Sequence, residues 1–367
     1  MKTSNIKKYL ALGLTLASAA YTPNLHATAV PVEVFIEGGS ASSSVLFDRA
    51  TNFFNGGSFT ATYSGSSIAK FVGTNTALSS LYEPITLDIN VNNGAIAGLS
   101  ALTTQVVGAG DTNLSNNGLA PVLVDSATQP KSVGVDGSKL IAWPTYVVPL
   151  VFIKNSKSGI DSGITNLTQR QAVTLETSTN LPATYYGGTN AGPVYFVGRN
   201  SQAAVRTITD FVIYNAGSIQ TYYTNGSSSV PVLDTSADPG LTSGSTLAKN
   251  VAAITNAIGT VAVQNIIANT TPLSYEGVSY SVSNVINGSY PLWGYENYYF
   301  LDSTKTGGVG NGGAPSAGQL AVITAFYGLV TNATFQSQSN PVFGTNFVPN
   351  ASLQVTRTVD GGQISPQ

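Results

Sequence analysis

Cysteine is absent from this chain of 367 residues, and histidine occurs once, at His26. The absence of cysteine excludes disulfide bonds, a cysteine nucleophile and the lipid-anchored amino terminus of a bacterial lipoprotein. His26 lies in or beside a predicted leader, so we expect the mature chain to lack Ser-His-Asp catalysis and ordinary zinc sites. A catalytic Ser-Lys arrangement or a catalytic pair of carboxylates remains formally possible, but no residue spacing in the sequence favours either. We therefore expect no metal, no cofactor and no enzyme activity.

Charge is also scarce. Charged residues make up 9% of the chain, against roughly 25% in an ordinary domain. The formal charge is 15 − 17 = −2, and without Lys2, Lys7 and Lys8 it is 12 − 17 = −5. This composition excludes the basic surface that nucleic-acid binding requires. A polar but weakly charged surface instead favours self-association.

Long apolar runs are missing after the amino terminus. The segment from Tyr9 to Ala20 follows three lysines and is too short to span a bilayer. Cleavage after Ala19, Ala27 or Ala29 would fit a secretory signal peptide. We favour Ala29, since a strand is predicted from Val32. The sequence thus predicts a signal peptide over 1–29 and an exported protein, periplasmic or extracellular, with no membrane span.

Three serine-bearing segments each follow a β-like run and precede apolar residues at helical spacing. They are residues 38–44 with Ser40 and Ser42, 63–67 with Ser66, and 198–202 with Arg199 and Ser201. A helix N-terminus offers unpaired N–H groups and partial positive charge. Three of them aimed at one point would hold an oxyanion without a metal. For each segment alone, a plain helix cap is the alternative.

Other segments complete the predicted pattern. Strands are expected over 85–91 and 104–108, the second placing Asp111 at its carboxyl end, where open α/β sheets bind ligands; the alternative is that Asp111 caps a turn. Residues 247–268 and 317–330 indicate helices. Two extended runs, 140–153 and 289–300, contain prolines that argue against plain central strands, and we interpret them as crossings between two lobes.

The order of these motifs resembles the periplasmic phosphate-binding protein family, within the type II solute-binding fold, from about residue 32 to about 334. Residues 38–42 and 63–67 resemble its two anion loops, with Ser66 at the ligand serine. Residues 108–111 are similar to the motif whose Asp accepts a proton from bound hydrogen phosphate, and 194–201 resemble the strand that ends at the ligand arginine. The resemblance implies ligand roles for Ser40, Ser42, Ser66, Asp111, Arg199 and Ser201.

The same resemblance shows departures. Ala203, Ala204 and Val205 stand where the family usually has Ser-Gly-Thr, so two hydroxyl donors are missing. Each hydrogen bond to a charged oxygen contributes roughly 1.5–3 kcal/mol, so the loss would weaken binding by roughly two to four decades. The first loop also departs from the family pattern at Ala41 and Ser42.

The sequence predicts an α/β protein with a two-lobed, periplasmic-binding-protein-like fold. Each lobe would be a sheet flanked by helices, with residues 30–145 and 289–367 in lobe I and 146–288 in lobe II, joined by two hinge strands. The leading hypothesis is a secreted, non-enzymatic protein that binds a phosphate-like anion between the lobes, possibly with an ABC permease as partner. The alternative is a surface or structural protein that self-associates and has lost tight binding.

Overall fold

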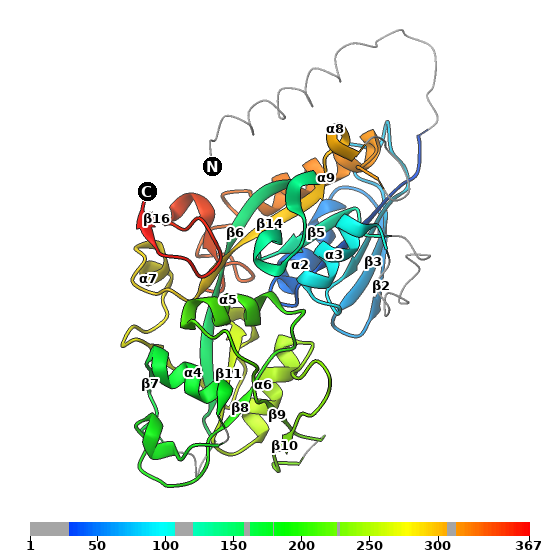
Figure 1. Ribbon diagram of the computed structural model, residues 1–367. Coiled ribbons are helices and arrows are strands. Elements are labelled where there is room, and N and C mark those ends of the chain that lie inside the picture. Colours follow the sequence, from blue (N-terminus) through cyan, green and yellow to red (C-terminus); the bar gives the residue numbers. More distant parts are fainter. Residues whose placement is uncertain (1–28, 107–119, 158–161, 179, 226–227, 307–312) are drawn as a thin grey trace, which may run out of the picture.

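The computed structural model describes residues 29–106, 120–157, 162–178, 180–225, 228–306 and 313–367. Its main feature is an eleven-stranded sheet that runs through the whole molecule (Figure 1). The strand order is β2 (Phe59–Ser64), β3 (Ile68–Gly73), β4 (Ile85–Asn90), β1 (Val32–Gly38), β5 (Leu123–Ser126), β14 (Trp293–Leu301), β6 (Leu140–Asn155), β11 (Ala257–Ala262) and β8 (Tyr195–Val197), with β12 (Thr270–Pro272) and β15 (Val348–Pro349) also pairing with β6.

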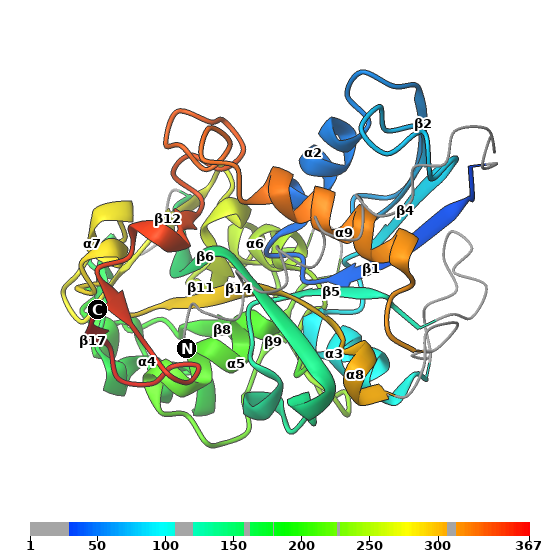
Figure 2. The same cartoon turned by 90° about the horizontal axis from the view of Figure 1, so that it is seen from above.

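Helices flank the sheet in two groups (Figures 1 and 2). Helices α2 (Ser43–Phe53), α3 (Ala95–Thr104) and α9 (Ala317–Val330) lie with strands β1 to β5, and α4 (Gln169–Thr177), α5 (Ala204–Ile213) and α6 (Gly244–Ala253) lie with β8 and β11. The shorter elements are α7 (Val282–Ile286), α8 (Ser303–Thr306) and the pairs β7 (Asn166–Leu167) with β13 (Ser274–Tyr275), β9 (Tyr222–Tyr223) with β10 (Val232–Leu233), and β16 (Val355–Thr356) with β17 (Ser365–Pro366). The predicted α/β class is confirmed.

Strand β6 connects the two groups of elements. All of its first ten residues except Thr145 pair with β14, and Leu150 to Lys154 pair with β11. The prediction that prolines exclude a central strand is wrong, because both prolines lie where the ladder is irregular. Pro144 adjoins a bulge that leaves Thr145 without a partner in β14, and Pro149 is the last residue paired with β14. A proline lacks the N–H that a regular ladder position uses.

Three local predictions are corrected by the structure. Ser66 does not begin a helix but lies in the turn of the β2–β3 hairpin, which Gly65 allows with a φ of +64°. Thr104 ends helix α3 instead of starting a strand. The segment after Leu247 is helical only to Ala253, and the residues around Gly259 form strand β11.

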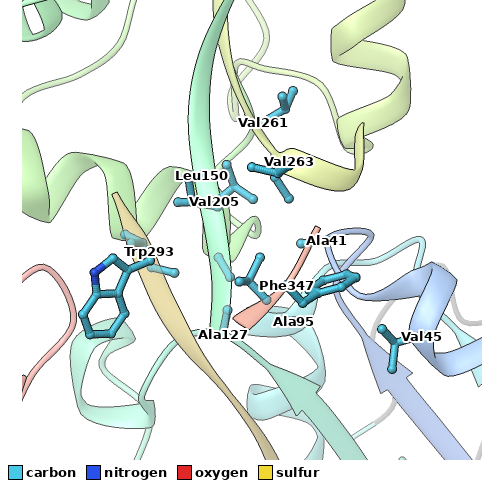
Figure 3. Packing of buried hydrophobic residues seen from close by; sticks show 14 of the residues in the cluster. Ala41, Val45, Ala95, Ala127, Leu150, Val205, Val261, Val263, Trp293 and Phe347 are labelled. Carbon is cyan, nitrogen blue, oxygen red and sulfur yellow. The ribbon is translucent and has the colours of Figure 1, made fainter. Parts of the chain in front are cut away.

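One buried apolar cluster extends through both groups of elements. In Figure 3, Ala41 before α2 lies near Val263 after β11, with Leu150 of β6 close by. The loops at the ends of the two strand groups are therefore held together by apolar packing as well as by polar contacts. Within the described ranges, no helix combines the length and apolarity needed to cross a membrane.

Candidate functional site

The carboxyl ends of two sets of parallel strands meet in this structure. Strands β1, β4 and β5 are parallel to one another, and β8 is parallel to β11. The loop after β1 meets the residues around α6 and β11: the Gly244 N–H donates to Ser40 Oγ at 3.2 Å, and Gln264 Nε2 donates to the Ser40 carbonyl at 2.8 Å. Ser44 Oγ also donates to Gln264 Oε1. Open α/β sheets bind ligands at such strand ends.

Arg199 lies two residues after β8 and is 5% exposed. Its Nε donates to the Leu241 carbonyl at 2.8 Å, and its Nη2 donates to the Thr242 carbonyl at 2.7 Å. No carboxylate of the described residues lies within 4.0 Å of the guanidinium. Burial lowers the pKa of Arg199 to about 10. A buried cation without a counter-charge is costly, so an anion bound here would stabilise it.

The remaining nitrogen of this guanidinium points toward the start of helix α6. Arg199 Nη1 makes no hydrogen bond within the described part of the chain. It lies 3.5 Å from the point where a Cβ on Gly244 would stand. The hydroxyl of Ser40 accepts from Gly244 but donates to no described acceptor. Two free donors, Arg199 Nη1 and the Ser40 hydroxyl, thus lie close to Gly244, the first residue of helix α6. Donors at a helix N-terminus suit an oxyanion.

The space beside Arg199 is small in this conformation. A cavity of about 10 Å³ is lined by Arg199, Val205 and Thr260, among others. Such a volume holds about one water molecule. None of Ser40, Gly244 and Gln264 lines this cavity. Because Ser40 Oγ accepts from the Gly244 N–H, an oxyanion can bind that N–H only if the contacts of Ser40 with Gly244 and Gln264 move apart.

Ser42 takes a different role from Ser40. It is fully buried, and its hydroxyl donates to the carboxylate of Asp125 at the end of β5. Asp125 lies next to Glu296 of β14, and both carboxyls are almost completely buried. Burial raises the pKa of Asp125 to about 7 and the pKa of Glu296 well above its ordinary value. The two carboxyls form a buried pair whose pKa values are both raised by burial, and Ser42 of the first serine loop donates to Asp125.

The other predicted residues lie apart from these contacts or outside the described residues. Ser66 is exposed in the β2–β3 turn. Ser201 is also exposed, and its backbone N–H donates to Asp238 Oδ1 at 2.9 Å. Asp111 lies outside the described residues. Of the six, the structure brings Ser40 and Arg199 together beside Gly244.

Sequence reasoning missed three contributors. Gln264 fell in the segment 247–268, which was predicted to be a helix, and Gly244, just before that segment, was given no role. Gly94, before α3, has a φ of +93°, and a Cβ there would stand 2.5 Å from the Gln202 carbonyl oxygen. The Asn92-Asn93-Gly94 turn after the predicted strand at 85–91 was the available signal for a helix start at α3.

Comparison with known proteins identifies the fold. No family model matches the chain, and no curated protein matches it in sequence. A putative phosphate ABC transporter substrate-binding protein from Clostridium perfringens, solved with bound phosphate, is similar in structure with a TM-score of 0.55 and 14% identity, over 83% of this chain and 95% of that one. A high-affinity periplasmic phosphate-binding protein, PfluDING, also with bound phosphate, has a TM-score of 0.50 and 13% identity, over 86% and 90%.

These similarities confirm the predicted fold. The chain has the architecture of periplasmic phosphate-binding proteins, in a form that has diverged to 13–14% identity from the two described above. At such low identity the similarity establishes the fold alone, so the ligand must be inferred from the residues of this chain.

Proposed function

We propose that this chain is an exported, non-enzymatic binding protein for a small oxyanion such as phosphate. The observation that carries the proposal is Arg199, a buried guanidinium with two nitrogens held by backbone carbonyls and the third unbonded beside the N-terminus of α6. The first two bonds fix the orientation of the group, and the third nitrogen is left to bind a ligand. Ser40 and the Gly244 N–H supply further donors, and the fold of phosphate-binding proteins supports the same reading.

Entry of the anion requires the two groups of elements to separate. We propose that residues 30–145 with 289–367 form one lobe and 146–288 the other, as the sequence predicts. Strand β6 supports this division, because its pairing changes from β14 to β11 between Pro149 and Leu150. Opening about this point would break the contacts of Ser40 with Gly244 and Gln264, and closure would bury the ligand. A proton-accepting role for Asp111 and delivery to an ABC permease remain part of the proposal.

The direct test uses two arginines that resemble each other. Arg357 is also buried, donates to the carbonyls of Trp293 and Pro291, stacks on Trp293 at 3.9 Å and has a pKa lowered by burial to about 10. It lies on the C-terminal segment instead of at the strand ends of β8 and β11. Because lysine cannot reproduce the planar fork of arginine, both Arg199→Lys and Arg357→Lys should destabilise the fold.

Phosphate binding should separate the two variants. In a calorimetric titration with inorganic phosphate, we expect Arg199→Lys to weaken binding by about tenfold or more and Arg357→Lys to leave affinity near that of the unmodified protein. Equal affinities in both variants would remove Arg199 from the site. Absence of binding to phosphate, sulfate and arsenate in the unmodified protein would overturn the proposal in favour of a structural role.

A further inference from the structure

The outer edge of strand β2 is the free end of the eleven-stranded sheet. In the described part of the chain β2 pairs only with β3, and all six of its residues are exposed. Figure 2 shows β2 at the outer edge of the molecule, beyond α2. An edge strand carries a row of backbone N–H and C=O groups without ladder partners, which is a template for another strand.

Strand β2 itself carries none of three features that usually block such pairing, namely a charge, a proline or a bulge. The segment from Phe59 to Ser64 has no charge and no proline, and its register with β3 runs over six residues without a bulge. Natural edge strands are usually blocked by at least one of these devices. Phe59 and Tyr63 are 38% and 56% exposed, although both rings also contact neighbouring aromatic rings near α2. An uncharged edge of six residues without a bulge is suited to strand addition.

The order of side chains on β2 is nearly symmetric about Ala61. It is aromatic, Thr, Ala, Thr, aromatic from Phe59 to Tyr63. If two copies run antiparallel with Ala61 opposite Ala61, each Phe59 faces Tyr63 of the other copy, and each Thr60 faces Thr62. Residues directly opposite then point to the same side of the joined sheet, as an antiparallel pair requires.

We propose that two copies of this chain associate by antiparallel pairing of their β2 strands about a two-fold axis at Ala61. Aromatic and Thr–Thr cross-strand pairs are both favourable, and a two-fold contact uses the same patch on both partners. The symmetry of the segment favours a second copy over an unrelated peptide, which would not need it. Six residues bury less than a standard interface, so the dimer should depend on protein concentration.

Cysteine scanning tests the register, because the chain contains no other cysteine. Across the proposed axis the two Ala61 Cβ atoms would stand about 4.5–5.5 Å apart, whereas the two Thr60 Cβ atoms would stand about 7–8 Å apart. Disulfides need about 3.5–4.5 Å, which only Ala61→Cys reaches with a small shift. We expect Ala61→Cys to form disulfide-linked dimers at least about tenfold faster than Thr60→Cys. Equal rates, or faster linkage through Thr60→Cys, would overturn the pairing.

Charge substitution tests the association itself. Thr60→Glu with Thr62→Glu places like charges opposite each other twice, and Thr60→Lys with Thr62→Glu places opposite charges there. In both double variants residue 62 faces Lys70 of the same chain, so fold stability should stay matched. By analytical ultracentrifugation we expect the double variant with two glutamates to dimerise about tenfold more weakly than the unmodified protein. The double variant Thr60→Lys with Thr62→Glu should dimerise about as tightly as the unmodified protein. A monomeric unmodified protein, a foreign peptide as the only partner, or equal behaviour of both variants would overturn the proposal.

Discussion

The side-chain oxygen of Ser40 accepts a hydrogen bond of 3.2 Å from the backbone N–H of Gly244. This bond joins the loop after β1 to the first residue of α6, and Arg199 lies beside it. The N–H that an oxyanion would use is therefore occupied by a serine hydroxyl in this conformation. Ligand binding in this account exchanges one acceptor for another of higher charge, which is a favourable exchange at a helix N-terminus.

A methyl group at Gly244 should block that exchange. Its Cβ would stand 2.5 Å from Asn265 Oδ1 and 3.5 Å from Arg199 Nη1, within the candidate site. We expect Gly244→Ala to weaken phosphate binding by about tenfold or more, measured by calorimetric titration. Gly328→Ala is the control, since a Cβ there meets no atom within 4 Å in helix α9. That change should stabilise the fold by about 0.5–1 kcal/mol and leave the phosphate affinity unchanged.

Phosphate affinity should be modest in the unmodified protein and should rise when hydroxyls are returned to the loop before α5. Ala203 is the N-cap of α5 without a side-chain cap, and Val205 lines the cavity beside Arg199. We expect Ala203→Ser with Val205→Thr to increase affinity by about tenfold or more, from one or two added hydrogen bonds to a charged oxygen.

Serine at position 203 will also cap the helix and raise stability by about 1 kcal/mol without ligand. The informative quantity is therefore the thermal shift on adding phosphate, compared between the two proteins. A saturating ligand at about 100 times its dissociation constant adds about 2.7 kcal/mol. A large shift at micromolar phosphate in the unmodified protein would show that other groups replace the missing hydroxyls.

Stability should fall as pH rises through neutrality. Burial raises the pKa of Asp125 from its ordinary value of about 4 to about 7 in the folded protein, so the folded state binds the proton more tightly than the unfolded state. The contribution of this group is complete below about pH 4 and is lost as pH rises toward about 7, with a slope approaching about 1.4 kcal/mol per pH unit. Burial also raises the pKa of Glu296, so this group acts in the same direction.

Removing the titrating groups tests this assignment. Asp125→Asn with Glu296→Gln keeps acceptors for Ser42 while abolishing both titrations. We expect urea unfolding of this variant to depend less on pH, between about 5 and 8, than that of the unmodified protein. Asp88, whose pKa burial also raises to about 7, should preserve part of the dependence. An unchanged slope would show that the buried pair does not hold its protons.

Gly94 should be intolerant of a side chain. A Cβ there would stand 2.5 Å from the Gln202 carbonyl oxygen, and its φ of +93° disfavours other residues. Gly65 is the control, because it has a φ of +64° but no atom lies within 4 Å of an added Cβ. Its substitution by alanine therefore measures the cost of the positive φ alone, without a steric clash. We expect Gly65→Ala to cost about 1 kcal/mol and Gly94→Ala to cost clearly more in urea unfolding. Equal costs would mean that the loops of α3 and α5 are not in close contact.

The sequence predicted much of the fold because several elements are locally consistent. Helix α9 spans Ala317–Val330 as predicted, and its start is marked by a capping box formed by Ser316 and Gln319. The loop at Ser40 and the strand-turn-helix around Arg199 were also recognisable, since each couples a β-like run to helical spacing.

The errors have a common physical cause. Ile68, Phe71 and Val72 fit helical spacing, but β-branched and aromatic residues also suit a strand, and pairing with β2 and β4 decides between them. The proline-bearing run 140–153 was interpreted as a crossing and not as a plain central strand. Only the tertiary structure shows that β6 is a central strand whose partner changes from β14 to β11 after Pro149. Contacts such as Ser40 with Gly244 join residues 204 positions apart, and no local pattern encodes them.

The central claim is that an oxyanion binds between Arg199, Gly244 and Ser40. The most direct measurement is a crystal structure of the full chain grown with saturating phosphate. The account predicts one phosphate with its oxygens within about 3.2 Å of Arg199 Nη1 and of the Gly244 N–H, and with the Ser40 hydroxyl turned from acceptor to donor. A phosphate bound elsewhere, or an intact bond from Gly244 to Ser40 with no phosphate beside Arg199, would contradict it.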